Sequence, residues 1–327
     1  MAIYFALLVL VGCKSPLEPN AFVDVDRSGS RTCGVTAAGE AFCWDDGNRE
    51  ISWSEAPQTG YVSLFELTDA IGVASREHDA CVLRDSGDVL CVAFDGDGNS
   101  LGYPSIPSAI EGLDNFVSIE AGPRHYCGIT DEGGVSCWGE ISGKLWGEET
   151  FFETPQVVPD IEKARVLSLG KAHSCAVQKD GLVKCWGDPD WGRLGASAHE
   201  TITVPDLPEA VDVAVSLRHT CAVADSQVWC WGHEPVIVGG EVSPPQVIEG
   251  IEGSVAIGGG LSLTCAVDKD GQAQCFERND DPERPSRWYE PESVSGLGEP
   301  GVVFGNIESI CSIDDLGALQ CIDARVQ

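Results

Sequence analysis

The sequence is short of positive charge. Lysine and arginine together number 20 against 52 aspartates and glutamates, so the formal net charge of the 327 residues is −32. A surface of this sign repels phosphate backbones and anionic lipid headgroups, which argues against nucleic acid as a partner. The same acidity favours solubility.

Long apolar runs are scarce too. After residue 12 no segment is apolar for long enough to cross a bilayer, and none repeats its apolar residues with a helical period. The sequence also has neither the H-E-x-x-H motif of zinc metalloproteases nor a phosphate-binding glycine loop. We therefore predict an all-β protein, and we assign no catalytic, cofactor-binding or metal-binding residue.

Cysteine, by contrast, is abundant. Of the 15 cysteines, all but one form pairs nine or ten residues apart, and the first members of successive pairs are 44 to 48 residues apart. A fixed period of this length indicates an array of similar units that stack on one another. The pairs are Cys33 with Cys43, Cys81 with Cys91, Cys127 with Cys137, Cys175 with Cys185, Cys221 with Cys230, Cys265 with Cys275, and Cys311 with Cys321.

Each pair brackets a predicted β-hairpin. Setting Cys175 opposite Cys185 leaves three residues to turn the chain, and the last of them is Gly181. A three-residue hairpin loop needs its last residue in the left-handed region, which glycine enters without cost. Six of the seven units have glycine there. In the remaining unit Cys221 and Cys230 are one residue closer, so a two-residue turn suffices.

Opposed cysteines favour disulfides, and we predict one within each hairpin. Directly opposed Cα atoms in an antiparallel pair lie roughly 4.5–5.5 Å apart, within reach of a disulfide. Such a bridge stabilises a short hairpin by about 2–3 kcal/mol. The alternatives are buried reduced thiols and zinc, whose paired ligands are usually closer in sequence. Disulfides require an oxidising compartment, so this prediction implies export.

The N-terminus bears on export independently. Residues 1–12 form an apolar run typical of a secretory signal, and the run ends in Leu10-Val11-Gly12-Cys13, which resembles the bacterial lipoprotein box. We predict a signal peptide over 1–12, lipidation of the unpaired Cys13 and a linker over 13–21. No lysine or arginine precedes the apolar run, which departs from a usual signal. The alternative is a free cysteine near the N-terminus.

The repeat predicts the fold. An apolar alternation precedes the hairpins, as at 116–119, and a further apolar stretch such as 155–158 follows some of them. Three or four strands in each of seven units predict a seven-bladed β-propeller over residues 22–327, as a single domain. Closing such a ring joins its first and last blades. We expect residues 15–18 or 22–25 to pair with the last blade.

The central units resemble a known repeat. His173, Cys175-Ala176-Val177, Asp180-Gly181, Cys185-Trp186-Gly187 and the run 191–195 resemble the repeat of the regulator of chromosome condensation family. The third and fifth units also match well, whereas the first, second, sixth and seventh are degraded. The resemblance implies a seven-bladed propeller that binds proteins. The family's eukaryotic members act on a small GTPase and on chromatin, and its secreted bacterial relatives include β-lactamase inhibitors.

The resemblance and the export signals together give the expected function. We expect a monomeric propeller that is anchored by lipid to a bacterial outer membrane or cell surface, binds a protein partner and has no catalytic activity. The alternatives are an inhibitor-like secreted binder and an extracytoplasmic hydrolase that uses acidic residues on one face. Exposed aromatic residues in blade connections are the first candidates for partner binding. They are Phe151, Phe152, Trp288 and Tyr289.

Two further patterns resemble metal sites. His125, His173 and His219 share one repeat position, two residues before a cysteine. Recurrence within a repeat favours packing and hydrogen bonding over metal binding. Residues 95–99 resemble the start of a calcium loop, but its sixth position is not glycine and its twelfth is not glutamate. We expect no metal at either place.

Overall fold

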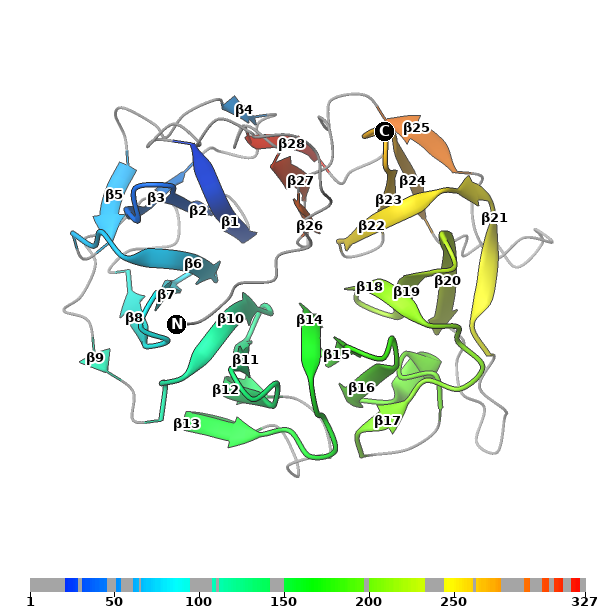
Figure 1. The fold of residues 1–327 in the computed structure, drawn as a ribbon, viewed down its shortest axis with the longest axis horizontal. Coiled ribbons are helices and arrows are strands. Elements are labelled where there is room, and N and C mark those ends of the chain that lie inside the picture. Colours follow the sequence, from blue (N-terminus) through cyan, green and yellow to red (C-terminus); the bar gives the residue numbers. More distant parts are fainter. Residues whose placement is uncertain are drawn as a thin grey trace.

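The structure is a computed structural model in which the chain forms an all-β ring (Figure 1). It describes a set of ranges that contains the paired strands of every hairpin, and everything below concerns these ranges. They are 21–28, 31–45, 51–53, 61–64, 66–94, 108–109, 112–141, 150–196, 200–232, 244–260, 263–277, 291–294, 302–305, 309–313 and 319–323.

The strands pair into seven four-stranded antiparallel sheets, here numbered along the chain. Sheet 1 holds β1 (Phe22–Ser28), β2 (Arg31–Thr36), β3 (Ala41–Asp45) and β5 (Tyr61–Leu64); sheet 2 holds β6 (Ala70–Ser75), β7 (Asp79–Arg84), β8 (Val89–Ala93) and β9 (Ser108–Ala109); sheet 3 holds β10 (Phe116–Ala121), β11 (His125–Thr130), β12 (Val135–Ile141) and β13 (Thr150–Val157); sheet 4 holds β14 (Ala164–Leu169), β15 (His173–Gln178), β16 (Val183–Gly187) and β17 (Ile202–Thr203).

The later sheets follow the same order, from an inner strand beside the axis to an outer edge. Sheet 5 holds β18 (Ala210–Val215), β19 (His219–Ala224), β20 (Gln227–Gly232) and β21 (Gln246–Glu252); sheet 6 holds β22 (Ser254–Gly259), β23 (Leu263–Asp268), β24 (Ala273–Glu277) and β25 (Glu292–Val294); sheet 7 holds β26 (Val302–Gly305), β27 (Ser309–Ile313), β28 (Leu319–Asp323) and β4 (Ile51–Trp53). A short 3₁₀ turn covers Asp190–Gly192.

The hairpin register predicted from cysteine spacing is confirmed. Cysteines face each other across all seven hairpins. Six of the predicted disulfides form, and they join Cys33 to Cys43, Cys81 to Cys91, Cys127 to Cys137, Cys175 to Cys185, Cys221 to Cys230 and Cys265 to Cys275. The side chains of Cys311 and Cys321 lie outside the described residues, so the seventh bridge stays a prediction.

The geometry of the hairpins differs from expectation in one respect. The bridged cysteines have Cα–Cα distances of 4.0–4.1 Å. This separation is shorter than the roughly 4.5–5.5 Å expected for directly opposed residues. The two-residue turn is confirmed, since Asp225 and Ser226 both have positive φ, 52° and 60°.

The apolar core lies between neighbouring sheets. One buried cluster joins Cys175, Val177 and Cys185 of sheet 4 to Val213 and Trp231 of sheet 5. All six residues of β15 are buried, because each face of the sheet packs on a neighbour. This arrangement explains why the hairpin strands are apolar at both odd and even positions.

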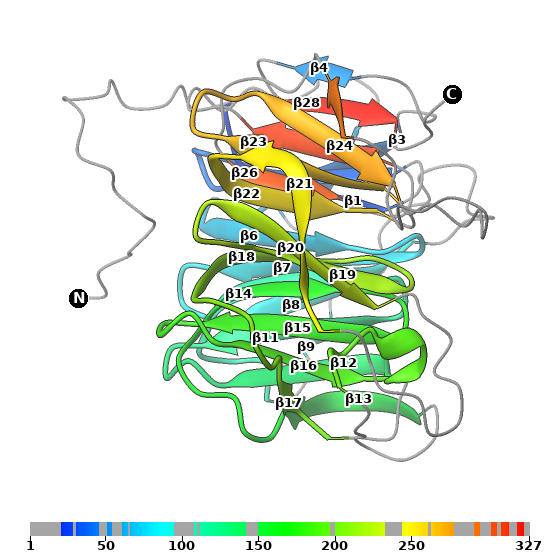
Figure 2. The ribbon, with the colours of Figure 1, turned by 90° about the vertical axis from the view of Figure 1, so that its right-hand side faces the viewer.

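The strands cross the thickness of the ring, so their connections gather on two opposite faces (Figure 2). One face carries the hairpin turns together with the starts of the inner strands, and we call it the turn face. Backbone bonds establish this placement. The Ala210 N–H donates to the Gly181 carbonyl at 2.9 Å, and the Phe116 N–H donates to the Gly87 carbonyl at 3.0 Å. The turn of each of these sheets therefore holds the start of the next inner strand.

The expected pairing of the N-terminus with the last sheet is wrong for residues 22–25. They belong to β1, which pairs with β2 in sheet 1. Sheet 7 takes its outer strand from β4, with Gln320 opposite Ser52. The chain leaves sheet 1 after β3, adds β4 to sheet 7 and returns as β5. Residues 15–18 lie outside the described residues.

Candidate functional site

The aromatic residues predicted to bind a partner do not form one patch among the described residues. Phe151 is 64% exposed on β13, the outer edge strand of sheet 3. Its neighbour Phe152 is partly buried and packs against the cluster between sheets 3 and 4. Phe152 is therefore held by the fold, and of this pair only Phe151 is free to meet a partner. Trp288 and Tyr289 lie outside the described residues.

The recurring histidines link neighbouring sheets. His125 Nε2 lies 3.0 Å from Ser174 Oγ, His173 Nε2 lies 2.7 Å from Thr220 Oγ1, and His219 Nε2 lies 2.9 Å from Thr264 Oγ1. Each histidine reaches the residue just before the first cysteine of the following sheet. The hydrogen-bonding role expected for the repeat position is confirmed.

These pairs have the separation of a nucleophile and its base, but their surroundings differ from those of a catalytic site. The three hydroxyl-bearing residues are at most 2% exposed, so no substrate reaches them. In the central pair, the Thr220 hydroxyl donates to the Arg193 carbonyl at 2.9 Å and must accept from His173 Nε2–H. Burial lowers the pKa of His173 well below its usual value, which keeps the ring neutral.

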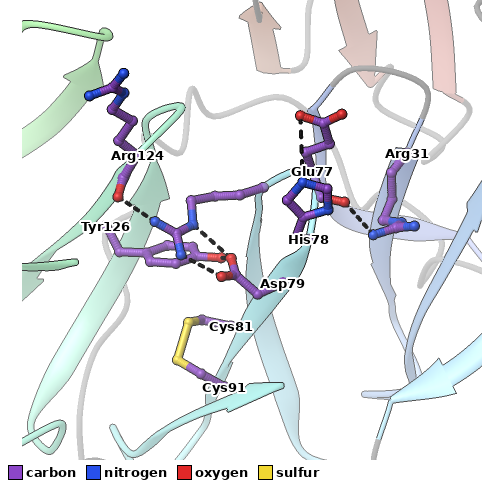
Figure 3. A network of polar contacts seen from close by, with 9 residues as sticks. Arg31, Glu77, His78, Asp79, Cys81, Cys91, Arg124 and Tyr126 are labelled. Carbon is purple, nitrogen blue, oxygen red and sulfur yellow. Dashed lines mark hydrogen bonds and ion pairs between the residues drawn. A yellow bond between two sulfur atoms is a disulfide. The ribbon is translucent and has the colours of Figure 1, made fainter. Parts of the chain in front are cut away.

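In sheet 2 a carboxylate replaces the histidine and builds a polar network (Figure 3). Asp79 accepts hydrogen bonds from the Arg76 guanidinium and from the Tyr126 hydroxyl of sheet 3. Arg76 also donates to the Arg124 carbonyl and lies over the Tyr126 ring, 4.7 Å from its centroid. This network fixes the connection between β6 and β7 against sheet 3.

Arg31 makes the corresponding link from sheet 1. Its Nη1 donates to the Glu77 carbonyl, and its guanidinium lies over the Phe94 ring, 4.3 Å from the centroid. The links of sheets 1 to 5 thus differ in chemistry but occupy the same level of the ring. The loops on this second face, opposite the turn face, therefore begin at strand ends that these side chains link to the next sheet.

Carboxylates on inner strands make a second set of links, beside the axis. Asp24 Oδ2 accepts from the Val73 N–H at 2.8 Å, Asp26 Oδ2 from the Ser75 N–H at 2.6 Å, and Asp212 Oδ2 from the Ile257 N–H at 2.9 Å. Inner strands are sheet edges, so their inward N–H groups need such acceptors.

These carboxylates bind protons more tightly than usual. Burial raises the pKa of Asp24 to about 7, against the bond from Val73 that lowers it, and the charge of Asp26 raises it further. Burial likewise raises the pKa values of Asp26 and Asp212 to about 6. Glu120 reaches solvent, but the surrounding protein and the charges of the other three raise its pKa well above normal. Sequence reasoning missed this group, although acidic residues at inner-strand positions were visible in the repeat.

The described ranges contain no group of three or more histidine, cysteine, aspartate or glutamate residues placed to hold a metal ion. The same ranges contain no helix that could cross a bilayer. The suspected calcium loop at 95–99 lies outside the described residues. The described residues form a ring whose sheets are linked by buried or partly buried polar side chains.

Comparison with known proteins identifies the type of ring. Residues 116–140 match the model of the regulator of chromosome condensation (RCC1) repeat. No curated protein matches the chain. Human WBSCR16 is similar in structure with a TM-score of 0.66 at 15% identity, over 94% of this chain and 89% of that one.

Two further solved structures are similar over most of the chain. Prp20p from Saccharomyces cerevisiae, described with its binding to Gsp1p and histones, has a TM-score of 0.66 at 13% identity, over 93% and 82% of the two chains. The CRINKLY WD40 ectodomain of the Arabidopsis thaliana receptor kinase ACR4 has a TM-score of 0.54 at 19% identity, over 93% and 95%. The TM-scores and the coverage show a shared fold, an RCC1-type propeller.

Proposed function

We propose that this chain is an exported, lipid-anchored propeller of seven blades that binds a protein partner on the bacterial cell envelope and does no catalysis. The RCC1-type fold supports a binding role, because Prp20p, which shares it, is described with protein partners. Nucleic acid is not a partner, because the net charge is −32.

The observation that carries the proposal is the set of six disulfides within the ring. Structural disulfides persist in oxidising compartments and are rare in the cytosol. Export in turn explains the apolar segment 1–12 and the lipobox ending at Cys13. A lipid on Cys13 would place the monomeric ring at a membrane surface despite its repulsive charge.

A binding role is also favoured by the chemistry of the ring. Its histidine–hydroxyl pairs are buried between sheets, and three of its axial carboxylates accept backbone hydrogen bonds. Groups committed in this way are poorly placed to attack a substrate. An inhibitor-like secreted binder is the alternative within the same class. An extracytoplasmic hydrolase would instead need converging acids in a substrate pocket.

The anchoring is tested by replacing Cys13 in the full chain expressed in a bacterial host. Wild-type protein is expected in the detergent-soluble membrane fraction and to incorporate labelled fatty acid. The Cys13→Ser variant is expected to lose the label and remain uncleaved or leave the membrane. Lys14→Ser, next to the box, is the matched control and should be processed normally. Equal labelling of the wild type and Cys13→Ser would contradict lipidation at this residue.

The binding role is tested by affinity capture from the native envelope with mature, oxidised protein as bait. Reduced and alkylated protein of the same sequence is the control. A partner captured by the oxidised ring alone, in a stable ratio, is the expected result. Turnover of envelope glycans or peptides by the purified ring would instead favour the hydrolase.

A further inference from the structure

Sheet 3 has the longest outer strand among the seven sheets. β13 has eight residues, whereas the outer strands of the other sheets have two to seven. It lies at the rim of the ring, and it ends the strand order of sheet 3, so no described strand pairs with its outer side (Figure 1). An unpaired strand edge of this kind is a template for pairing with another polypeptide.

The two most exposed large apolar side chains of the described residues both belong to this strand. Phe151 is 64% exposed and Val157 is 71% exposed, against 40–48% for the others that are exposed. β21, the next longest outer strand, has no exposed large apolar side chain, because its two isoleucines are buried. The length of an outer strand therefore does not by itself explain the exposed apolar side chains of β13.

The backbone of Phe151 points away from the sheet. Phe151 lies opposite Glu140 of β12, and the Glu140 N–H donates to the Arg124 carbonyl on the β11 side at 3.0 Å. Two opposed residues of an antiparallel pair either bond to each other or both point their backbone groups away. The N–H and carbonyl of Phe151 therefore point outward, where no described strand meets them.

The backbone of Val157 has the same orientation. Val157 lies opposite Ser136, and the N–H of the next residue, Val158, donates across to the Val135 carbonyl at 2.8 Å. Successive residues of a strand point their backbone groups to opposite sides, so those of Val157 point outward. The edge thus offers a donor and an acceptor at each of these two positions.

The exposed side chains of Phe151 and Val157 also project from one side of sheet 3. Their opposite residues, Glu140 and Ser136, are four apart on β12, and residues at even spacing on a strand point to the same face. Trp138, midway between these two, is buried in the cluster that joins sheets 2 and 3. The two side chains therefore project from the side of sheet 3 that faces sheet 2.

The middle of β13 is irregular. Its register with β12 shifts there, Pro155 has no N–H, and Gln156 Nε2 donates to the Thr154 carbonyl at 3.1 Å. Glu153 is exposed in the same stretch. Regular pairing is therefore available at the two ends of the edge, with a carboxylate between them.

We propose that the outer edge of β13 is the docking site for an extended, cationic segment of a partner protein, which adds to sheet 3 as a fifth strand. Its backbone bonds to Phe151 and Val157, its apolar side chains pack on theirs, and a lysine or arginine lies beside Glu153. In strand addition, main-chain hydrogen bonds give affinity and alternate side chains give specificity. This inference rests on the proposed binding function and gives it a location and a mode.

Charge decides against a second copy of this chain as the occupant. Each copy has a net charge of −32, and antiparallel pairing of two β13 strands about their middle would bring two Glu153 side chains together. Like charges brought together at an interface weaken association. A cationic strand is instead attracted by the field of the ring, and it supplies a counter-charge for Glu153.

The test measures binding of two synthetic octapeptides to the mature, oxidised protein by fluorescence anisotropy at physiological ionic strength. One peptide alternates valine and lysine. The other has the same sequence with every peptide nitrogen methylated, which removes the backbone donors and keeps the side chains and the charge. The unmethylated peptide is expected to bind at least about tenfold more tightly, because only it forms main-chain hydrogen bonds with β13. Equal affinities would overturn strand addition.

Variants locate the site. The double variant Phe151→Ser with Val157→Ser changes two side chains that are already exposed, so the melting temperature should stay unchanged. Its affinity for the unmethylated peptide should fall at least about tenfold, because the apolar contacts are lost. Val211→Ser, at an exposed valine on an inner strand of sheet 5, is the matched control and should bind like the wild type. Wild-type affinity in the double variant would overturn the site.

Amide hydrogen exchange of the wild type, followed by NMR, reports on the backbone directly. The N–H groups of Phe151 and Val157 point outward in the free ring, and their exchange should slow at least about tenfold when the unmethylated peptide binds. The amides of β21 are the internal control and should be unaffected. Slower exchange confined to residues outside β13 would place the peptide elsewhere and overturn the proposal.

Failure of this site differs from failure of the binding function. Capture of the same envelope partner by the wild type and by the double variant, in equal yield, would overturn the site and leave the binding function intact. Capture of no partner by the wild type would count against the binding function, whereas the peptide measurements would still decide whether β13 accepts a strand.

Discussion

Side chains that bridge neighbouring sheets recur at two repeat positions, one beside the hairpin cysteines and one on the inner strands. At the first, His219 reaches Thr264, and at the second, Asp24 reaches the Val73 N–H. Both kinds of group are withdrawn from water, so each needs its partner to offset the lost hydration. Sheet-to-sheet cohesion therefore depends on individual polar side chains as well as on apolar packing.

The raised pKa of Asp24 predicts a pH-dependent stability. Its pKa is about 7 in the folded protein against an unfolded value of 3.8, so the folded state binds the proton more tightly. The free energy of unfolding should rise as the pH falls from about 7 towards 4, and the destabilisation should be complete above pH 7. Asp24→Asn keeps an acceptor for the Val73 N–H and removes the charge.

The melting temperature of Asp24→Asn is therefore expected to exceed that of the wild type by a few degrees at pH 8 and by much less at pH 5. Glu132→Gln, which removes the charge of an exposed carboxylate, is the control and should leave the difference between the two pH values as in the wild type. A lower melting temperature for Asp24→Asn at pH 8 would show that the ionised carboxylate is needed.

The histidine–hydroxyl pairs predict that substitutions of the two partners have non-additive effects on stability. His219→Leu alone leaves the buried Thr264 hydroxyl without its hydrogen-bonding partner, which costs about 1–3 kcal/mol of unfolding free energy. The sequence carries an apolar version at the next junction, with Leu263 in place of histidine and Ile310 in place of threonine. The double variant, His219→Leu with Thr264→Val, should therefore lose less than the two single variants added together.

Denaturant unfolding of the wild type, both single variants and the double variant measures this coupling. Additive losses would mean that the His219–Thr264 bond contributes nothing beyond separate packing of each side chain.

Among elements, the hairpin turn does two tasks at once. It reverses the chain between the disulfide-linked strands, and its carbonyl holds the start of the next inner strand, as Gly181 holds Ala210. Glycine is therefore favoured at the turn for two reasons: its φ is positive, and the segment that leads into the next inner strand leaves no room for a side chain. A Cβ built on Gly181 would lie 2.7 Å from Glu209 Cβ and 2.9 Å from its Cα.

Gly181→Ala and Gly250→Ala separate these two effects. Both glycines have positive φ, 81° and 87°, but a Cβ at Gly250 meets nothing within 4 Å. The positive φ alone costs about 1–2 kcal/mol for an L-residue. Gly250→Ala should lose this amount of unfolding free energy, and Gly181→Ala should lose more, because Glu209 must move. Equal losses of unfolding free energy, measured by chemical denaturation, would mean that Glu209 and its backbone move aside without an energetic cost.

At the scale of the whole molecule, the ring is closed by β4, which lies between two strands of sheet 1 in sequence but pairs with sheet 7. β4 lies in the connection between β3 and β5, so sheet 7 gains its outer strand from a segment near the other end of the chain. This pairing joins the two ends of the array without a covalent link.

Replacing residues 51–53 by three glycines is expected to lower the melting temperature by several degrees and to speed protease cleavage within β26–β28. Glycine lowers strand propensity and removes the side chains while the length of the connection stays constant. The same replacement at Glu292–Val294, the outer strand of sheet 6, which does not join the two ends of the array, is the control and should have a smaller effect. Identical melting of the two variants would refute a closing role for β4.

The sequence alone determined the hairpins, their cysteine register and the period. These features depend on local geometry: a turn length, a glycine and the spacing of two residues that face each other. Six disulfides, the register of the seventh pair and the all-β architecture follow from it, and the propeller type agrees with the repeat. The link role of His125, His173 and His219 was also readable, because a repeated residue meets a repeated environment.

Tertiary structure alone decided which strand closes the ring, which of the two neighbouring phenylalanines is exposed and where the inner-strand carboxylates gather. The apolar alternation at Ile51–Trp53 was visible, but nothing local distinguishes a strand that pairs with its own hairpin from one that pairs with the last. Phe151 and Phe152 are neighbours in sequence, yet only the packing of sheet 4 against sheet 3 buries part of Phe152. Such contacts join residues distant in sequence, and their energies depend on the assembled ring.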